Sequence, residues 1–251
     1  MPDPIPRFVD YHCHLDLYPD YENQFAKCSE QMVATLAVTT TPRAWPRNRE
    51  LSEKSAFVRV GLGLHPQLVG DRSGEFRLFE KHFSESRFIG EVGLDASPPY
   101  YGSYREQKEI FERVLRLCAE HGNKILSVHS VRATRDVLTF IEKLLPAERS
   151  RVVLHWFGGT KAEGKLAAEL GCYFSVNAEM LNKDPRRAVV ATLPLTRILT
   201  ETDGPFTTTF DQPSRPADVS CVIPLLQSLF NMGAEEIRKQ LIANLYALES
   251  A

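Results

Sequence analysis

The chain has 251 residues, of which 43% are hydrophobic and 25% charged, and its formal net charge is −2. This length suits one large α/β domain or two small ones, with a core large enough to need no disulfide bridges. The slightly acidic balance argues against a protein that coats nucleic acid non-specifically, because such binding needs a basic surface. A small basic rim around a pocket remains compatible with it.

Cysteine usage and hydropathy predict a cytoplasmic protein that does not enter the membrane. The number of cysteines is odd and no CxxC pair occurs, which favours reduced thiols over a disulfide framework. The N-terminus shows neither the basic nor the apolar region of a secretory signal. No apolar run approaches the length of a membrane span. The cysteines are Cys13, Cys28, Cys118, Cys172 and Cys221.

Short apolar runs alternate with helical patterns from one end of the chain to the other. Apolar residues recur at helical spacing in 104–121, in 135–145 and in 237–248. The runs, which are typical of buried parallel strands, are 8–11, 33–39, 57–64, 88–92, 125–129, 152–155, 173–176 and 198–202.

Eight such strands with helices between them predict an α/β fold, a single (β/α)₈ TIM barrel over 1–251. An open, doubly wound sheet is the alternative, but no GxGxxG or GxxxxGK[ST] motif supports a nucleotide-binding version of it. The stretches 96–103 and 204–216 are predicted to be irregular loops on the catalytic face of the barrel.

The first run ends in three polar residues at alternating positions, Asp10, His12 and His14. Alternate side chains of a strand share one face, so the two histidines can bind one metal ion together. Tyr11 and Cys13 then point the other way, which makes Cys13 an unsuitable ligand. Asp10 lies deeper and is expected to orient a ligand. A merely polar strand end is the alternative interpretation of the HxH pattern.

Glu91 lies in the run 88–95 (FIGEVGLD), which is otherwise largely apolar. A buried carboxylate is costly unless it is paired or bound to a cation. A salt bridge to a lysine or arginine would satisfy it, but we favour a carboxylate that bridges two metal ions. Asp95, four residues later, is expected to hold a ligand, the substrate or the following loop.

Two further runs end in a histidine, His129 and His155. A single histidine at a strand end is usually structural, but two in successive strands, added to the HxH pattern, favour metal ligands. Trp156 offers an aromatic surface for the substrate, with core packing as the alternative. His65 ends the third run, has no obvious metal partner, and is predicted to contact the substrate.

The last run, 198–203, reads ILTETD and is followed by Gly204-Pro205. Asp203 is predicted to bind a metal ion and to accept the proton of the attacking water, while Glu201 is expected on the same face of the strand. A turn or helix-capping role is the alternative for Asp203. A mixed set of histidines and carboxylates suits Zn²⁺, Mn²⁺ or Mg²⁺, and two such ions would lie roughly 3.5–4 Å apart.

These motifs resemble, as a set, the TatD family of metal-dependent nucleases within the amidohydrolase-like barrels. The resemblance places the metal ligands on His12, His14, Glu91, His129, His155 and Asp203. It implies that Glu91 bridges two divalent ions, that Asp203 also acts as the base, and that the activity is hydrolysis of DNA, typically from an end. The motifs are DYHCHL at 10–15, GLHP at 63–66, GEVGLD at 90–95, HS at 129–130, HWFGG at 155–159, ETDGP at 201–205 and the asparagine at 244.

Other segments are similar to the TatD-type nuclease (QatD) of the Qat anti-phage defence system, namely 15–20 (LDLYPD), 37–45 (AVTTTPRAW), 155–157 and 199–206. This resemblance implies a role in prokaryotic defence and other subunits of that system as partners.

The chain departs from the family pattern in three places near the mouth of the predicted site. Val131 occupies the position of a family arginine, with Arg132 beside it, Arg215-Pro216 stands in for the usual pattern after Asp203, and Ala96-Ser97 replaces paired aromatics. These departures put substrate choice in doubt and leave metal binding unaffected. Arg132 and Arg215 are candidate phosphate contacts, together with Arg43, Arg47 and Arg105, although a solvated surface charge is the alternative for each.

The sequence therefore predicts a deoxyribonuclease that acts on ends or single strands of DNA. An amidase, lactonase or aminoacyl-ester hydrolase is one alternative, because the chemistry at the metal ions barely distinguishes an ester from a phosphodiester. A mainly structural component of a defence complex is the second.

Overall fold

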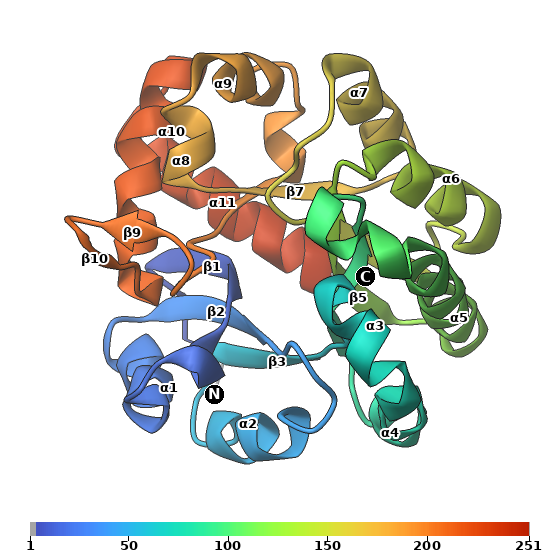
Figure 1. Ribbon diagram of the computed structural model, residues 1–251. Helices are drawn as coiled ribbons and strands as arrows, with labels where there is room; N and C mark the ends of the chain where they lie inside the picture. Colours follow the sequence, from blue (N-terminus) through green and yellow to red (C-terminus); the bar gives the residue numbers. More distant parts are fainter. Residues whose placement is uncertain (1–3, 251) are drawn as a thin grey trace. The chain divides into compact units, whose positions relative to one another are not determined.

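The computed structural model describes residues 4–250, in which strands and helices alternate along the chain (Figure 1). The main strands follow one another in the sheet in chain order, and β1 with β2 and the pairs from β3 to β7 are parallel. This is the predicted topology of a (β/α)₈ barrel. The strands are β1 (Phe8–Cys13), β2 (Val33–Val38), β3 (Val58–Leu62), β4 (Phe88–Asp95), β5 (Lys124–Val131), β6 (Ser150–Leu154), β7 (Tyr173–Val176) and β8 (Ile198–Thr200).

The helices cover the predicted patterns closely, and the predicted helix over 104–121 begins and ends as expected. The α-helices are α1 (Tyr21–Glu30), α2 (Trp45–Ser52), α3 (Val69–Arg72), α4 (Phe76–Phe83), α5 (Tyr104–His121), α6 (Thr134–Leu144), α7 (Lys161–Glu169), α8 (Ala178–Leu181), α9 (Asp184–Val190), α10 (Val222–Phe230) and α11 (Ala234–Glu249). Short 3₁₀ turns are η1 (Leu15–Leu17), η2 (Pro66–Leu68), η3 (Ser73–Glu75), η4 (Pro98–Ser103), η5 (Leu195–Arg197) and η6 (Pro216–Cys221).

The two stretches expected to be irregular are more ordered than predicted. Residues 96–103 contain the 3₁₀ turn η4, and residues 204–216 contain a small hairpin of β9 (Thr208–Thr209) and β10 (Gln212–Pro213). Strands of two residues are too short to show a period in the sequence, which is why the pattern missed them.

The chain divides into two compact units, which we describe separately. Unit 1 consists of the described residues of Met1–Ala37, Pro46–Val60 and Ser175–Ala251. In this unit α11 packs against β1, β8 and α10, and its buried face consists of Ile237, Leu241, Asn244, Leu245 and Leu248.

Unit 2 consists of Val38–Trp45 and Gly61–Phe174. Its longest helix, α5, packs against β4 and α6 through an apolar face that includes Ile110, Phe111 and Val114. Three phenylalanines of α4 are buried, and the rings of Phe76 and Phe79 are stacked with centroids 5.2 Å apart. The single-domain organisation stays a prediction.

Candidate functional site

In unit 1, His12, His14 and Asp203 form a buried cluster. The Oδ1 atom of Asp203 lies 3.6 Å from Nε2 of His12 and 3.5 Å from Nε2 of His14. The two imidazole rings are 5.2 Å apart and inclined by 73°. One carboxylate oxygen therefore faces two imidazole nitrogens, one from the end of β1 and one from His14, the residue that follows this strand.

Backbone hydrogen bonds set this arrangement. The amide of Asp203 donates to the His12 carbonyl at 2.9 Å, and the amide of His14 donates to the Gly204 carbonyl at 2.8 Å. Asp203 has a φ of 55°, a left-handed conformation that aspartate tolerates better than most residues. The end of β1, with the residue after it, is thus joined to the segment that follows β8 at the positions that carry the candidate ligands.

Asp10 contacts the cluster indirectly, through Thr202. Its carboxylate accepts hydrogen bonds of 2.7 Å from both the amide and the hydroxyl of Thr202, the residue before Asp203. Burial raises the pKa of Asp10, the Thr202 hydrogen bonds oppose this, and the nearby charge of Glu201 raises it further. Asp10 thus contacts the residue before Asp203, and the predicted orienting role stays a prediction.

In unit 2, three histidines surround one oxygen of Glu91. Glu91 Oε1 lies 2.7 Å from His129 Nδ1, 3.2 Å from His65 Nε2 and 3.5 Å from His155 Nε2. Glu91 is almost completely buried. The contacts of this carboxylate thus include three imidazoles.

Asp95 holds His129 from the other side of the ring. Its Oδ2 atom lies 3.0 Å from His129 Nε2 and 2.8 Å from Nε2 of Gln67, which donates to it, while Ser97 donates to its Oδ1. Burial alone would raise the pKa of Asp95, but these hydrogen bonds outweigh burial and lower it. Burial lowers the pKa of His129, and the hydrogen bonds to Asp95 and Glu91 outweigh it and raise the pKa. The substrate contact predicted for Asp95 stays a prediction.

The structure corrects the expectation that His65 has no metal-binding group near it. Ligand atoms of His65, Glu91 and His129 all lie within 4.8 Å of one another. However, His65 Nδ1 accepts a hydrogen bond of 3.1 Å from the amide of Gln67. A neutral imidazole that accepts at Nδ1 carries its proton at Nε2, which makes that atom a donor rather than a ligand. His65 thus faces Glu91 as a hydrogen-bond donor.

Two glycines of the sequence motifs permit close backbone approach around Glu91 and His129. A Cβ atom at Gly63 would lie 1.8 Å from the carbonyl oxygen of Thr39, which accepts from the Glu91 amide. Gly93 has a φ of 140°, and a Cβ atom there would lie 2.1 Å from the His129 carbonyl oxygen. A side chain at either position would displace the backbone that carries these ligands.

Both clusters have the chemistry of a site for a divalent cation. Each places several imidazole nitrogens against one carboxylate oxygen, a mixed set that suits Zn²⁺ or Mn²⁺. A buried carboxylate with aligned imidazoles and a hydrogen-bonded outer partner such as Asp95 is typical of metal sites in proteins.

A family model described as "TatD related DNase" matches residues 9–250. The chain belongs to the TatD family. Members of this family are metal-dependent hydrolases, and some are named deoxyribonucleases.

Known TatD proteins resemble this chain over most of its length. "Deoxyribonuclease TATDN3" of Homo sapiens is 29% identical over 217 residues, covering 78% of this chain and 77% of the human protein. "Uncharacterized metal-dependent hydrolase YjjV" of Escherichia coli K12 is 28% identical, covering 97% of this chain and 98% of that protein. The crystal structure of YJJV, a TATD homolog from the same organism, superimposes with a TM-score of 0.87 at 25% identity, covering 99% and 100% of the two chains. The predicted fold class and the predicted family are confirmed.

The substrate-binding residues predicted for this TatD protein occupy different surroundings. Arg132 is exposed at the end of β5, with a φ of 52°. Trp156 is half-buried, and its ring meets that of His155 edge to face at 6.4 Å. Arg215 is exposed, lies 3.3 Å from the Asp20 carboxylate, and places its guanidinium 5.7 Å from the centre of the Tyr18 ring. Their contacts with substrate stay predictions.

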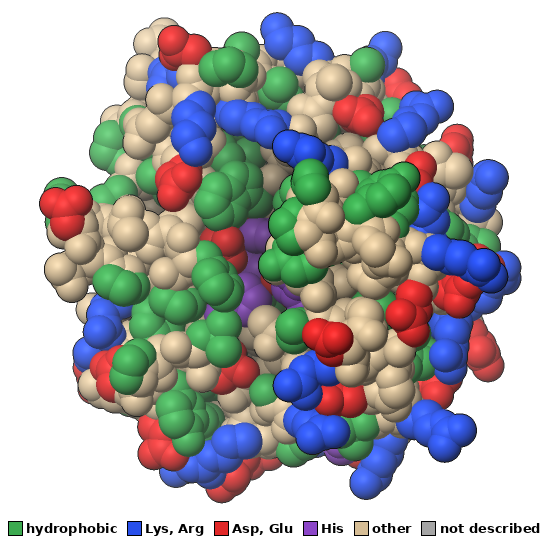
Figure 2. Space-filling view, viewed as in Figure 1, with side chains coloured by type: hydrophobic (Ala, Val, Ile, Leu, Met, Phe, Trp, Pro, Cys, Tyr) green, Lys and Arg blue, Asp and Glu red, His purple; other side chains and the backbone are tan. Residues whose placement is uncertain are grey.

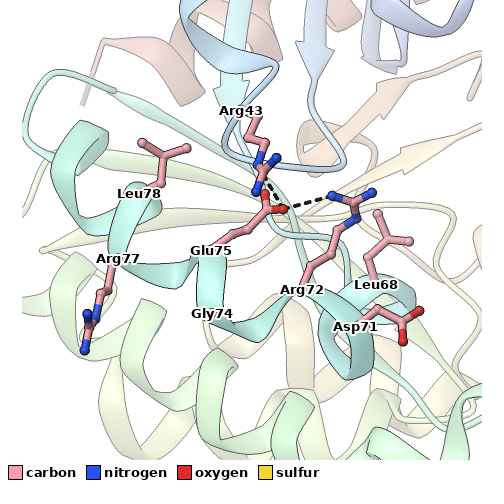
Figure 3. A pocket seen from close by; sticks show the side chains of 8 residues that line it. All are labelled: Arg43, Leu68, Asp71, Arg72, Gly74, Glu75, Arg77 and Leu78. Atoms are coloured by element: carbon pink, nitrogen blue, oxygen red, sulfur yellow. Dashed lines mark hydrogen bonds and ion pairs between the residues drawn. The ribbon is translucent and has the colours of Figure 1, made fainter.

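Arg43 lies in unit 2 at a pocket of 790 Å³ (Figure 3). Its Nε donates to Glu75 Oε1 at 3.1 Å, and Arg72 reaches the same oxygen at 2.9 Å. Arg77 points away from Glu75. The pocket is lined by Arg43, Leu68, Asp71, Arg72, Gly74, Glu75, Arg77 and Leu78. Arg43 thus tethers the loop after β2 to η3.

The surface carries charges of both signs. In Figure 2, Lys and Arg side chains are interspersed with Asp and Glu over the visible face. Arg47 and Arg105, two further candidate phosphate contacts, are each paired with glutamates. In residues 4–250, no helix is both long and apolar enough to cross a bilayer.

Proposed function

We propose that this TatD protein is a metal-dependent deoxyribonuclease that hydrolyses phosphodiester bonds at ends or single strands of DNA. One observation supports it above the others: in each unit a buried carboxylate oxygen faces two or more imidazole nitrogens. The printed names of TatD relatives, among them "Deoxyribonuclease TATDN3", supply the substrate class.

In this proposal the metal ligands are His12, His14 and Asp203 from unit 1, and Glu91, His129 and His155 from unit 2. Two divalent ions, Zn²⁺, Mn²⁺ or Mg²⁺, supply Lewis acidity and lower the pKa of a bound water. Asp203 would accept a proton from water at its carboxylate, and Glu91 would hold metal through its carboxylate. Asp95 holds His129 in its orientation through the 3.0 Å contact at Nε2.

The contacts with substrate are assigned to side chains around these ligands. His65 is assigned a contact with the substrate, and Arg132 and Arg215 offer guanidinium groups to the DNA backbone. Trp156 contributes an aromatic surface, and Asp95 contacts the substrate in addition to His129.

The biological setting we propose is a prokaryotic anti-phage defence system, with other subunits of a Qat-type assembly as partners, acting in the cytoplasm. The similarity of 15–20, 37–45 and 199–206 to the Qat nuclease supports it. All five cysteines are free thiols, which suits a reducing compartment.

The decisive test is cleavage of end-labelled single-stranded and blunt duplex DNA with Mg²⁺, Mn²⁺ or Zn²⁺, by the wild type and by Asp203→Asn. Loss of the proton-accepting carboxylate should lower the cleavage rate by at least about 100-fold. Asp211→Asn is the matched control, because Asp211 is an exposed aspartate of the same loop and also has a positive φ, of 60°. It should cleave like the wild type.

Two results would contradict this function. If DNA stays uncut with all three metals while carboxylic esters, lactones or amides are hydrolysed, the protein is the rival type of hydrolase. If Asp203→Asn gives full protection in a phage-challenge assay, the chain serves the defence system as a structural component.

A further inference from the structure

Phe206 is a large apolar side chain that the fold leaves exposed beside the unit 1 cluster. Its side chain is 62% exposed, and its ring centroid lies 5.1 Å from that of His14 with the planes inclined by 82°. The two rings meet edge to face, so they do not stack on each other. Much of the Phe206 ring is therefore available to another flat group.

The loop that carries Phe206 is tied to the end of β8 on both sides of the ring. The amide of Phe206 donates to the Asp203 carbonyl at 2.9 Å, and the hydroxyl of Thr207 donates to the Thr202 carbonyl at 2.6 Å. The amide of Ser214 in turn donates to the Thr207 carbonyl at 2.9 Å. These bonds hold the ring at a defined place relative to Asp203 and His14, which lowers the entropy cost of binding.

Glycine at position 204 shows how closely this loop is packed. A Cβ atom there would lie 2.1 Å from the Tyr18 hydroxyl and 2.2 Å from the Ser214 carbonyl oxygen. Tyr18 also donates a hydrogen bond to that carbonyl. The loop is packed closely at Gly204, whereas the Phe206 ring is mostly exposed and lies outside the buried core of unit 1.

We propose that Phe206 is a stacking platform for the nucleobase next to the scissile phosphate. This inference rests on the proposed function, in which His14 and Asp203 would help to hold a metal ion near the scissile phosphate. Successive bases of a strand lie only about 3.4 Å apart along the axis, so a base beside the phosphate is within reach of a ring in contact with His14. Aromatic rings bind the faces of all four bases, which suits an enzyme without sequence preference.

Stacking on Phe206 would also favour single strands and frayed ends over duplex DNA. Inside a duplex both faces of each base are covered by neighbouring base pairs, so a base must leave the stack before it can lie on Phe206. A single strand or a frayed end meets this requirement at little cost. Phe206 thus gives a physical reason for a preference for single strands and ends.

The test is a double-mutant cycle between the ring and the base, measured as kcat/KM of the metal-loaded enzyme on single-stranded oligonucleotides. Phe206→Ala should lower kcat/KM on an intact oligonucleotide by about 5- to 100-fold, the range for base–aromatic stacking. In two further oligonucleotides an abasic residue replaces one or the other nucleotide flanking the scissile bond. On the abasic oligonucleotide that lacks the base in contact with Phe206, Phe206→Ala should change kcat/KM by less than about twofold, because the ring has no base to stack on.

Two variants serve as references. Phe206→Trp keeps a stacking surface and should retain the wild-type preference for single strands over blunt duplex, which Phe206→Ala should reduce. Tyr246→Ala removes an aromatic ring that is 42% exposed on α11 of the same unit, and should change none of the rates.

The outcomes separate this inference from the proposed function. If the wild type cleaves DNA but Phe206→Ala has wild-type kcat/KM, the ring contacts something else, such as a protein subunit, and the inference is wrong. An equal loss on the intact and on both abasic oligonucleotides would show a merely structural role and would also overturn it. If the wild type cleaves no DNA at all, the proposed function fails and the inference falls with it.

Discussion

At the scale of single residues, both clusters rely on one carboxylate oxygen that several imidazoles share. Glu91 Oε1 faces three of them and Asp203 Oδ1 faces two. A buried carboxylate has a high desolvation cost, which nearby cations or protonated imidazoles offset. The same residues that satisfy Glu91 in the fold are therefore suited to sharing a metal ion with it.

Asp95→Asn tests how far outer hydrogen bonds tune these ligands. An amide lacks the charge that holds His129 Nε2, so His129 should turn more freely and metal affinity should fall by about 10- to 100-fold. Competition with a chromophoric chelator measures this affinity directly. Asp71→Asn, at an exposed carboxylate of the same unit, is the matched control. Wild-type affinity in Asp95→Asn would show that the Asp95 contact does not position the ligand.

At the scale of elements, the asparagine near the C-terminus joins α11 to the start of β8. The side chain of Asn244 donates to the carbonyls of Leu195 and Ile198, at 2.8 and 2.7 Å, and accepts from Gln240 at 2.7 Å. The residue is buried. A structural role thus explains why Asn244 is among the sequence motifs. Its side chain fixes where β8 begins, five residues before Asp203.

Asn244→Ala should lower the free energy of unfolding by about 1–3 kcal/mol, because one buried and one partly buried carbonyl lose their donor. Urea denaturation of wild type and variant measures the difference. Asn182→Ala, at an exposed asparagine after α8, should change stability by less than about 0.5 kcal/mol. An equal, small effect of both substitutions would mean that solvent replaces the Asn244 bonds at no cost.

At the scale of the whole molecule, each compact unit contains its own group of proposed ligands, and metal binding should therefore stabilise the folded chain. A ligand at about 100 times its Kd adds about 2.7 kcal/mol to the free energy of unfolding. We expect EDTA to lower the melting temperature and Mn²⁺ or Zn²⁺ to restore it in a concentration-dependent way. Differential scanning calorimetry measures both changes.

Ligand variants decide whether that stabilisation comes from the proposed residues. His12→Ala in unit 1 and His155→Ala in unit 2 should each reduce the shift that metal produces. A control substitution at His121, an exposed residue at the end of α5, should leave the shift intact. If neither EDTA nor added metal changes the melting temperature of the wild type, the result would argue against resident ions.

Much of the fold could be predicted because strand and helix periods are local properties of the chain. The eight apolar runs became the eight main strands, and α5 kept its predicted bounds. The alternation of the first run predicted that His12 and His14 share a strand face, but β1 ends at Cys13, and both imidazoles face Asp203 through the turn that follows the strand. The β9–β10 hairpin escaped prediction, because it is shorter than any recognisable period.

The sequence by itself determined which side chains lie in or just after each strand, although β8 ends at Thr200, so that Glu201 and Asp203 follow the strand and do not share a strand face as expected. Only the tertiary structure decided that His65 faces Glu91, that Asp95 holds His129, and that Asp10 reaches Thr202. The reason is physical. A face follows from the two-residue period within one strand, whereas a contact between strands depends on their relative register, which distant parts of the chain set together.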